Sequence, residues 1–457
     1  MAKSILIHCY TNLHQVEELN FWQEVAKVLS DRGYNLFLLA SSGPSQNNFN
    51  FNYSIFWERL NFQEKYFLPT LTAKNYDLNY FSNLLKLENR WYGVKPNSRS
   101  LNAAFYLKNL YEILIEELNP CLAIIGNGHH ATDVILNDVV ESKKIPKAYI
   151  ERGCLTNSWH LDLAGITAGS NIAQNYFEFD LNGDTNLFNI YEKEYFKTKS
   201  TWWEQPKTST NISLREEYEI NEDQKIVLFL NQLDNDTSNM LYSPLFQNNL
   251  DAINWFSAQF LKENLNSIIF VKKHPKLSDQ LKHSINNLRN VIWIEDRDLF
   301  SCLVEVDLVC TVNSTGLYEA LLHKKPVLQL GLSILSKKNI AYEIKNKNDT
   351  QILLDWYNTV GINKKINRFK HLVTYLISNE LYFFSSELAP YSFPGADAFA
   401  KRLFTFFKEE REGNIPDRFL ERKNALISKG ELKKIGVKAQ LEVSIYLFKI
   451  WFYRFTK

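Results

Sequence analysis

The sequence contains no apolar run of about 18 residues, the length that a helix needs to span a bilayer. Its N-terminus leads directly into the run SILIHCY at residues 4–10, which is too short and too strand-like for a signal peptide. We therefore expect a cytoplasmic protein that meets a membrane only through its surface.

Cysteine is scarce and charge is balanced. The five cysteines form an odd set without a CxxC pair or a Cys/His ligand spacing, which argues against a disulfide framework and a structural metal. Lys and Arg number 52 against 51 Asp and Glu, a net charge of +1, whereas a general nucleic-acid binder shows a basic excess. We expect no cofactor, no metal and no nucleic-acid partner.

Two nucleotide-binding signatures are missing as well. The pattern GxxxxGK[ST] does not occur, which excludes a P-loop, and no GxGxxG follows the first apolar strand. The second absence counts against a dinucleotide-dependent oxidoreductase. Any phosphate-binding site in this chain must be built from other residues.

What the sequence does contain is a strand and helix alternation that occurs twice. Apolar strand candidates at 4–10, 35–40, 121–125 and 147–151 alternate with helical segments at 16–30, 101–118 and 131–142, and residues 41–100 look like a partly helical insertion. A second series runs from 225–232 to 326–330 after an aperiodic connection at 180–222. The α/β pattern predicts two facing Rossmann-like domains, residues 1–200 and 201–410, the second ending in a helical stretch from 349.

The C-terminal segment, residues 411–457, is predicted to be a basic, amphipathic helical extension. Residues 418–457 hold ten Lys and Arg against three Asp and Glu, and apolar side chains between 445 and 455 fall at helical spacing. Such a helix suits an interfacial contact with the inner membrane. A terminal helix docked on the protein's own surface is the alternative.

Three strand ends in the second domain carry polar groups, and ligands of open α/β sheets bind at the carboxyl ends of strands. One is Lys272-Lys273-His274-Pro275, where two cations and an imidazole leave a strand together. Lysine charges suit a phosphate, and His274 could protonate or hydrogen-bond a leaving phosphate. A solvated basic turn is the alternative.

The second strand end is Asn313-Ser314-Thr315-Gly316, placed where a helix begins. Hydroxyl groups and backbone N–H groups at such a place suit a phosphate, although Ser and Thr also cap helices routinely. Glu319, one turn further on, lies within reach of a nucleotide ribose.

The third strand end runs from Gln232 to Asp236 and contains two carboxylates, at Asp234 and Asp236. One of them could act as a nucleophile or base, while an ordinary Asn/Asp turn is the alternative. In the first domain, Glu151-Arg152 ends a strand and could serve an acceptor hydroxyl. The turn 126–130 adds Asn127 and His129 as acceptor contacts, although such histidines more often belong to plain loops.

In this order, the elements Glu151-Arg152-Gly153, Gln232 to Asp236, Lys272 to Pro275 and Asn313-Ser314-Thr315 resemble those of bacterial capsule Kdo transferases. The run at 316–327 is also similar, and the whole resemblance covers about residues 120–331. That family has the GT-B fold and uses CMP-activated 3-deoxy-ulosonic acids; bacterial sialyltransferases are more distantly similar. Arg152 stands where the family has a second acid.

The resemblance implies a role for each candidate. Asp236 would be the nucleophile of a retaining enzyme, and Glu151 would handle the acceptor. The catalytic candidates are Asp236, Glu151 and His274. The donor-binding candidates are Gln232, Lys272, Lys273, Pro275, Asn313, Ser314, Thr315, Gly316 and Glu319. The acceptor-binding candidates are Arg152, Asn127 and His129. The partners implied are a CMP-activated sugar donor and a glycan or glycolipid acceptor.

Two other functions stay open. One is a GT-B transferase that uses a UDP- or GDP-hexose, and the other is a non-catalytic carbohydrate-binding scaffold of a polysaccharide assembly complex. Asp234 and Asp236 have the Asp-x-Asp spacing of metal-dependent GT-A transferases, but the two-domain pattern does not fit that class. The Lys-x-His-Pro element favours CMP over UDP or GDP.

Overall fold

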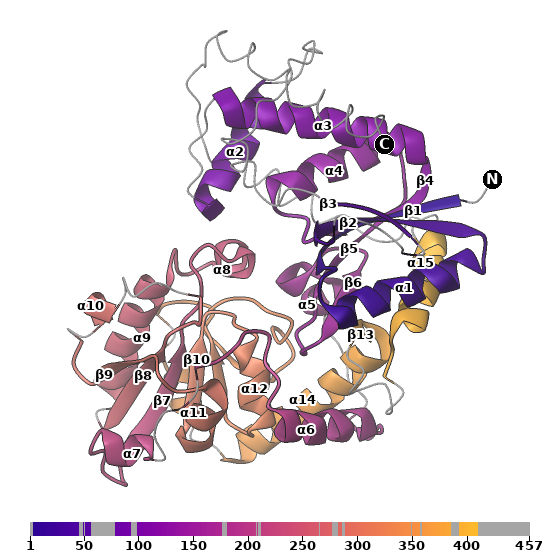
Figure 1. Ribbon diagram of the computed structural model, residues 1–457. Helices are drawn as coiled ribbons and strands as arrows, with labels where there is room; N and C mark the ends of the chain where they lie inside the picture. The colour runs from indigo at the N-terminus through magenta and orange to yellow at the C-terminus, as the bar shows by residue number, and fades with distance from the viewer. Residues whose placement is uncertain are drawn as a thin grey trace.

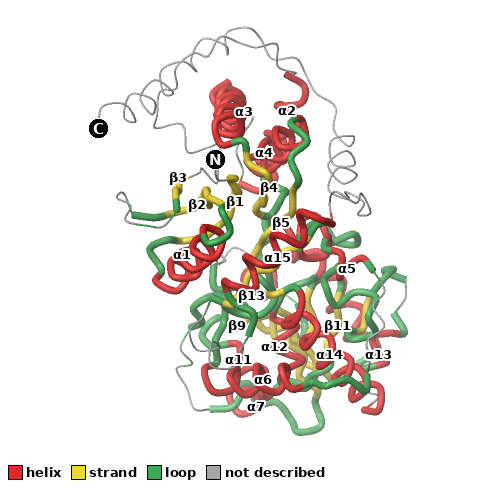
Figure 2. The backbone as a smooth tube through the Cα atoms, turned by 90° about the vertical axis from the view of Figure 1, so that its right-hand side faces the viewer, coloured by secondary structure: helices red, strands yellow, loops and turns green. Residues whose placement is uncertain are grey.

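We describe the protein from a computed structural model. It describes residues 3–44, 49, 51–55, 78–92, 98–175, 181–206, 208, 212–264, 266–276, 282–285, 288–348, 350–356, 359–384 and 393–409. The chain forms two α/β bodies, one above the other in Figures 1 and 2. The predicted class, two facing Rossmann-like domains, is confirmed. The predicted tail, residues 411–457, lies outside the described residues.

The first sheet has seven strands in the order β13-β6-β5-β4-β1-β2-β3. Strands β1 to β5 are parallel, whereas β6 runs antiparallel to β5 and to β13. The strands are β1 (Lys3–Asn12), β2 (Tyr34–Ser42), β3 (Asn52–Ile55), β4 (Pro120–Gly126), β5 (Lys147–Arg152), β6 (Ser158–Asp162) and β13 (Leu381–Phe383).

Helices cover both faces of this sheet, as parallel strands with apolar side chains on both faces require. One face packs against α1 (Val16–Ser30) and α15 (Ala396–Glu409). The other packs against α2 (Leu78–Tyr92), α3 (Ser98–Leu118) and α4 (Ala131–Ser142). In Figure 1, α3 and α4 lie above the sheet while α1 and α15 lie below it.

The second sheet is parallel throughout and has the order β12-β11-β10-β7-β8-β9. Its central strand β7 carries the run IVLFL, which is buried on both faces. The strands are β7 (Lys225–Leu230), β8 (Ser267–Lys272), β9 (Val291–Ile294), β10 (Leu308–Thr311), β11 (Val327–Gln329) and β12 (Tyr342–Glu343).

The helices of the second body also form two layers. One core includes side chains from α9 (Asn249–Glu263), α10 (Lys282–Ile285) and α13 (Ile352–Asp355). The opposite core includes α6 (Asn186–Thr198), α7 (Leu214–Glu217), α11 (Leu299–Glu305), α12 (Gly316–Leu322) and α14 (Thr359–Asn379). Three short elements complete the fold. In the chain, η2 (Thr167–Gly169) and α5 (Asn171–Gln174) follow β6 of the first sheet, and α8 (Thr237–Tyr242) follows β7 of the second.

The structure corrects two sequence expectations. Residues 180–222, expected to be an aperiodic connection, contain α6, whose Phe188, Tyr191 and Tyr195 are buried in the core of the second body. The stretch after residue 349, expected to be helical, contains β13. Both β13 and α15 lie inside the range 201–410 predicted for the second domain, yet they complete the first sheet and its core.

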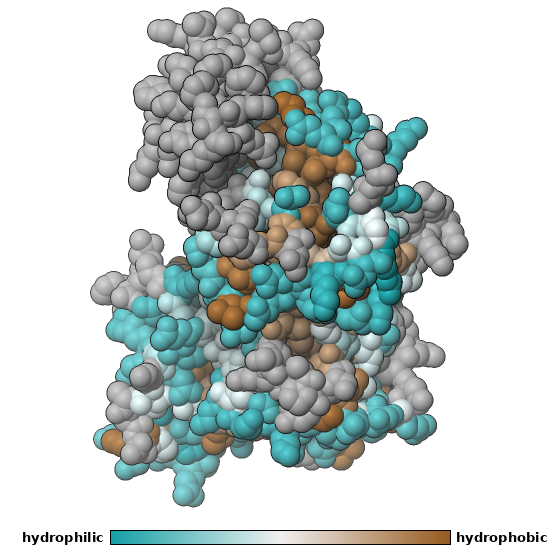
Figure 3. All heavy atoms as spheres, turned by 45° about the vertical axis from the view of Figure 1, so that its right-hand side comes forward, coloured by the Kyte–Doolittle hydropathy of each residue, from teal (hydrophilic) through white to brown (hydrophobic). Residues whose placement is uncertain are grey.

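The five cysteines are all free; Cys9, Cys302 and Cys310 are buried, while Cys121 and Cys154 are half-buried. Among the helices in the described part of the chain, none combines the length and apolarity needed to cross a membrane. The face shown in Figure 3 is mainly hydrophilic, with an apolar strip in the upper body.

Candidate functional site

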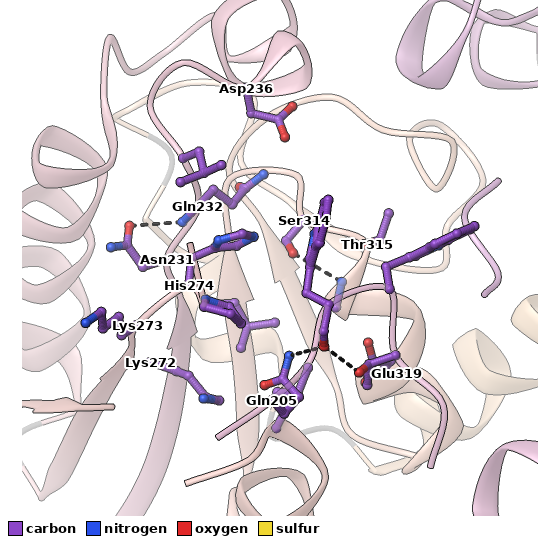
Figure 4. Close-up of a pocket in the computed structure, with 18 of the residues that line it drawn as sticks. Gln205, Asn231, Gln232, Asp236, Lys272, Lys273, His274, Ser314, Thr315 and Glu319 are labelled. Carbon is purple, nitrogen blue, oxygen red and sulfur yellow. Dashed lines mark hydrogen bonds between the residues drawn. The ribbon is translucent and has the colours of Figure 1, made fainter. Parts of the chain in front are cut away.

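A pocket opens at the carboxyl ends of β7, β8 and β10. It is lined by Thr201, Trp202, Trp203, Gln205, Leu230, Asn231, Gln232, Leu233, Asp236, Ser238, Lys272, Lys273, His274, Pro275, Leu299, Asn313, Ser314, Thr315, Gly316 and Glu319. Figure 4 shows Asp236 at one end of this pocket and Gln205 with Glu319 at the other, with Ser314 and His274 between. The three polar strand ends of the second domain therefore meet in one place, as the topology rule predicts.

His274 presents a neutral imidazole to this pocket. The backbone N–H of Lys276 donates to His274 Nδ1 at 3.2 Å, so the ring proton sits on Nε2. Burial, helped by the charges of Lys276 and Lys272, lowers the pKa of His274 to about 4. At neutral pH this residue is thus a hydrogen-bond donor through Nε2 and not a proton donor. Of the two roles expected for it, hydrogen bonding to the leaving phosphate fits this state and protonation of that phosphate does not.

Lys272 and Glu319 are the ionisable side chains at one end of the pocket. The buried Lys272 donates through Nζ to the carbonyl of Arg297 at 2.6 Å, and burial lowers its pKa. Burial raises the pKa of Glu319 to about 8, against the opposing effects of the Tyr195 hydroxyl and Lys272. Tyr195 OH donates to Glu319 Oε2 at 3.3 Å, so α6 supports this carboxyl from behind.

Lys273 and Pro275 flank the pocket differently. Lys273 Nζ lies 3.6 Å from Glu295 Oε2, and Figure 4 shows its side chain directed away from the other labelled residues. Pro275 is exposed in the turn that follows His274. The structure thus places Lys273 at the edge and Lys272 inside.

The turn before α12 brings hydroxyl groups to the pocket. Ser314 Oγ accepts the N–H of Gly316 at 3.2 Å, while Thr315 is exposed and its side chain makes no capping bond. A Cβ on Gly316 would come within 2.6 Å of Leu230 Cδ1, so a larger residue there would require the Leu230 side chain to move. Thr315 is therefore presented toward the pocket by a tightly packed turn.

The two carboxylates after β7 have different surroundings. Asp234 Oδ1 accepts from the backbone N–H and the side-chain Nδ2 of Asn249, which ties it to the start of α9. Asp236 caps α8 by accepting from Ser238 N at 2.8 Å, and it remains exposed at the rim of the pocket. Desolvation by the walls of the cleft raises the pKa of Asp236, against the effect of the Ser238 hydrogen bonds. Only Asp236 belongs to the pocket.

Gln232 and Asn313 brace the pocket from beneath. Gln232 Nε2 donates to Asn313 Oδ1 at 3.0 Å, and Gln232 Oε1 accepts from Asn313 N and from Thr311 Oγ1. Asn313 Nδ2 in turn donates to the carbonyls of Ser238 and Tyr242. These two side chains, predicted to bind the donor, join the ends of β7 and β10 to α8 and so set the position of Asp236.

The first domain places Glu151 across the cleft from Asp236. Asn127 Nδ2 donates to both carboxylate oxygens of Glu151, at 3.2 and 3.0 Å, and also reaches Thr237 Oγ1 at 3.5 Å on the second domain. Burial, followed by the charge of Asp236, raises the pKa of Glu151 to about 8. The positive φ of Asn127, 49°, is one that asparagine tolerates well.

The other two acceptor candidates contact different partners. His129 Nε2 lies 3.2 Å from the hydroxyl of Tyr242, a second bridge to α8. Arg152 NH2 lies 3.3 Å from Oε1 of the buried Glu18, and its guanidinium packs on the ring of Trp202. His129 therefore serves the domain junction, while Arg152 faces α1 and the connecting segment.

Residues 201–205 line the pocket although the sequence interpretation assigned them only to a connection. They follow α6, lie between the two domains and contribute Trp202, Trp203 and Gln205. The adjacent tryptophans were the one available signal, and nothing in their spacing indicates a pocket.

One group in the described part of the chain has three potential metal ligands close together: His160, Asp162 and Glu380, whose ligand atoms lie within 4.8 Å of one another. Both oxygens of Asp162 already accept backbone N–H groups, from Ala164, Gly165 and Asn171. This group joins β6 to the start of β13 and does not line the pocket.

Comparison with known proteins gives a family match over residues 147–350, to the model described as capsule polysaccharide biosynthesis protein. The match includes all three polar strand ends and Glu151. It confirms the resemblance to capsule polysaccharide proteins that those elements predicted. No curated protein matches the sequence.

Solved structures give distant matches. Thermosulfurimonas dismutans KpsC, beta Kdo 2,4 transferase, matches with 17% identity and a TM-score of 0.40 over 55% of this chain and 79% of its own. The beta Kdo 2,7 transferase of the same organism's KpsC matches with 15% identity and a TM-score of 0.40 over 70% and 95%. UDP-GlcNAc 2-epimerase from Neisseria meningitidis matches with 11% identity and a TM-score of 0.35 over 82% and 100%. Likeness at this level says nothing of activity.

Proposed function

We propose that this chain is a metal-independent glycosyltransferase that moves Kdo or a related nonulosonic acid from its CMP-sugar onto a surface polysaccharide or glycolipid acceptor. The observation that carries the proposal is the meeting of Asp236, His274 and the Ser314–Thr315 turn in one pocket, with Glu151 opposite. The capsule polysaccharide family match over the same residues supports it.

The pocket suits the phosphate of the leaving nucleotide. His274 offers a neutral Nε2–H, and Thr315 offers a hydroxyl without a capping partner. Lys272 adds a buried positive charge nearby. Donors that are fixed before the reaction stabilise charge that develops on a leaving group, typically by about 3–4 kcal/mol for one well-placed donor.

In this proposal Asp236 is the nucleophile. In the proposed reaction its carboxylate attacks the anomeric carbon, the bond from that carbon to the CMP oxygen breaks, and CMP leaves with the electron pair. The acceptor hydroxyl then attacks the same carbon, loses its proton to Glu151 and releases Asp236. Two displacements at one carbon retain its configuration.

Glu151 is suited to the second step. Part of its high pKa comes from the negative charge of Asp236. When Asp236 is converted to a neutral glycosyl ester, that charge disappears and the pKa of Glu151 falls, so the base form is favoured when the acceptor arrives.

A pair of variants tests this role. Asp236→Asn keeps an oxygen that can accept from Ser238 N, so we expect CMP binding to persist, measured by isothermal titration calorimetry, while transfer from CMP-Kdo falls below detection. Asp234→Asn is the matched control: its side-chain oxygen can still accept from Asn249, and transfer should stay near the wild-type rate.

Full transfer by Asp236→Asn would remove Asp236 from the mechanism. Equal loss in the two variants would assign both residues to folding of the loop after β7.

A further inference from the structure

The segment between α6 and α7 joins the two domains through two adjacent tryptophans. Trp202 belongs to the first domain: its Nε1 donates to the carbonyl of Gly153 at 3.0 Å and its ring packs on Arg152. Trp203 belongs to the second: Lys276 Nζ lies 3.5 Å from its ring centroid, and His274 meets it edge-on at 6.4 Å. This segment is therefore a wall of the pocket held from both sides.

Trp203 is an exposed side chain of the pocket wall. Its side chain remains 39% exposed, although it lies beside the imidazole expected to hold the phosphate. Lys276 Nζ covers one face of the ring, and the opposite face, next to a phosphate site, is suited to stacking on a nucleobase, since every base offers a π-face.

Gln205 lies on the same wall and has an unused acceptor. Its Nε2 donates to the carbonyl of Trp203 at 3.3 Å, which fixes the direction of the amide. Its Oε1 is buried and has no hydrogen-bond partner in the described part of the chain. Figure 4 shows Gln205 between Lys272 and Glu319. A buried acceptor without a partner favours a ligand that brings an N–H group to it.

We propose that the connecting segment forms the nucleobase subsite: the Trp203 ring stacks on a pyrimidine, and Gln205 Oε1 accepts from its exocyclic amine. This inference rests on the proposed function, since it places the base of the donor nucleotide. Under this proposal Gln205 makes the site prefer an aminopyrimidine to a ketopyrimidine. A ketopyrimidine has a carbonyl oxygen at the same ring position, so two hydrogen-bond acceptors would face each other without a proton between them.

Three ligands separate stacking from phosphate binding. We expect the wild-type chain to bind CMP more tightly than UMP, and both more tightly than ribose 5-phosphate, which has the phosphate and no base. Trp203→Ala should weaken the binding of CMP and of UMP by about tenfold or more and leave the affinity for ribose 5-phosphate unchanged. Trp203→Phe should retain most of the affinity for all three ligands.

Gln205→Leu should act on selectivity. We expect this variant to bind CMP more weakly and UMP as before, so that the ratio of the two dissociation constants, measured by calorimetry, moves close to one. Trp255→Ala is the control for loss of an aromatic side chain, because Trp255, in α9, packs on Phe246 and does not line the pocket.

The possible failures can be told apart. If Trp203→Ala weakens all three ligands equally, or none, stacking is wrong. If Gln205→Leu leaves the CMP to UMP ratio unchanged, or the wild-type chain binds the two equally, the role of Gln205 is wrong. If the wild-type chain binds no CMP, the proposed function itself fails, and the subsite with it.

Discussion

Glu151 is the residue whose ionisation most affects the proposed transfer reaction. Its pKa is raised to about 8, so it is mostly protonated at pH 7 and becomes a base as the pH rises through 8. Because Asp236 is a neutral ester when Glu151 acts, we expect the transfer rate to rise with pH below 8, and Glu151→Gln to remove the rise together with most of the activity. A pH profile of kcat for both proteins measures this, and a flat wild-type profile would contradict the role of Glu151 as the base.

The same shift affects stability with the opposite sign. Because the folded protein holds a proton on Glu151 between pH 4.5 and about 8 while the unfolded chain does not, this group stabilises the fold at low pH, and the contribution is lost as the pH rises through 8. The protonated form of Glu151 therefore stabilises the fold, while the ionised form of Glu151 is the one that acts as the base.

At this scale the sequence predicted residue types better than residue roles. It indicated that Asp236, His274 and Thr315 follow strand ends, and the structure brings them together. It could not separate Asp234 from Asp236, because the difference lies in Asn249, which reaches back from α9 to hold Asp234. Nor could it find Trp203, since only the fold brings the connection to the pocket.

Glu151 lies in β5 and is held in place by the neighbouring strand β6 and by β13 beyond it. Gly153 follows β5, and a Cβ there would come within 2.1 Å of Ser158 Oγ and 2.8 Å of Leu381 Cδ2. We expect Gly153→Ala to lower the free energy of unfolding by about 1–3 kcal/mol and to reduce transfer, because it separates β5 from β6 and β13.

Gly395→Ala is the matched control for that substitution. A Cβ on Gly395 meets no atom closer than 3.5 Å, so urea denaturation should show little change in its free energy of unfolding. Equal stability of the two variants would mean that the junction of β5, β6 and β13 tolerates a methyl group and is looser than described.

The elements that sequence patterns missed are those whose partners are distant. Strand β13 is three residues long and exists because Leu381 to Phe383 pair with β6, more than 200 positions earlier. Helix α6 does carry apolar side chains at helical spacing, at Phe188, Tyr191 and Tyr195, but polar and aromatic neighbours obscure the period. The regular βα alternation, by contrast, was predictable because each unit satisfies its own periodicity.

Over the whole molecule, the cleft is defined by contacts that cross from one domain to the other. Asn127 meets Thr237, and His129 meets Tyr242, so the loop after β4 rests on α8. The same helix begins at Asp236. Contact between the domains and the position of the proposed nucleophile are therefore coupled through one short helix.

Product analysis by mass spectrometry tests the proposed transfer of a ulosonic acid. The chain is incubated with CMP-Kdo, other CMP-ulosonates, UDP-hexoses and GDP-hexoses, each with a panel of glycan and glycolipid acceptors. We expect an acceptor to gain the mass of one ulosonic acid from a CMP donor and to gain nothing from the hexose donors. Transfer of a hexose from UDP or GDP, with none from any CMP-ulosonate, would contradict the proposed transfer.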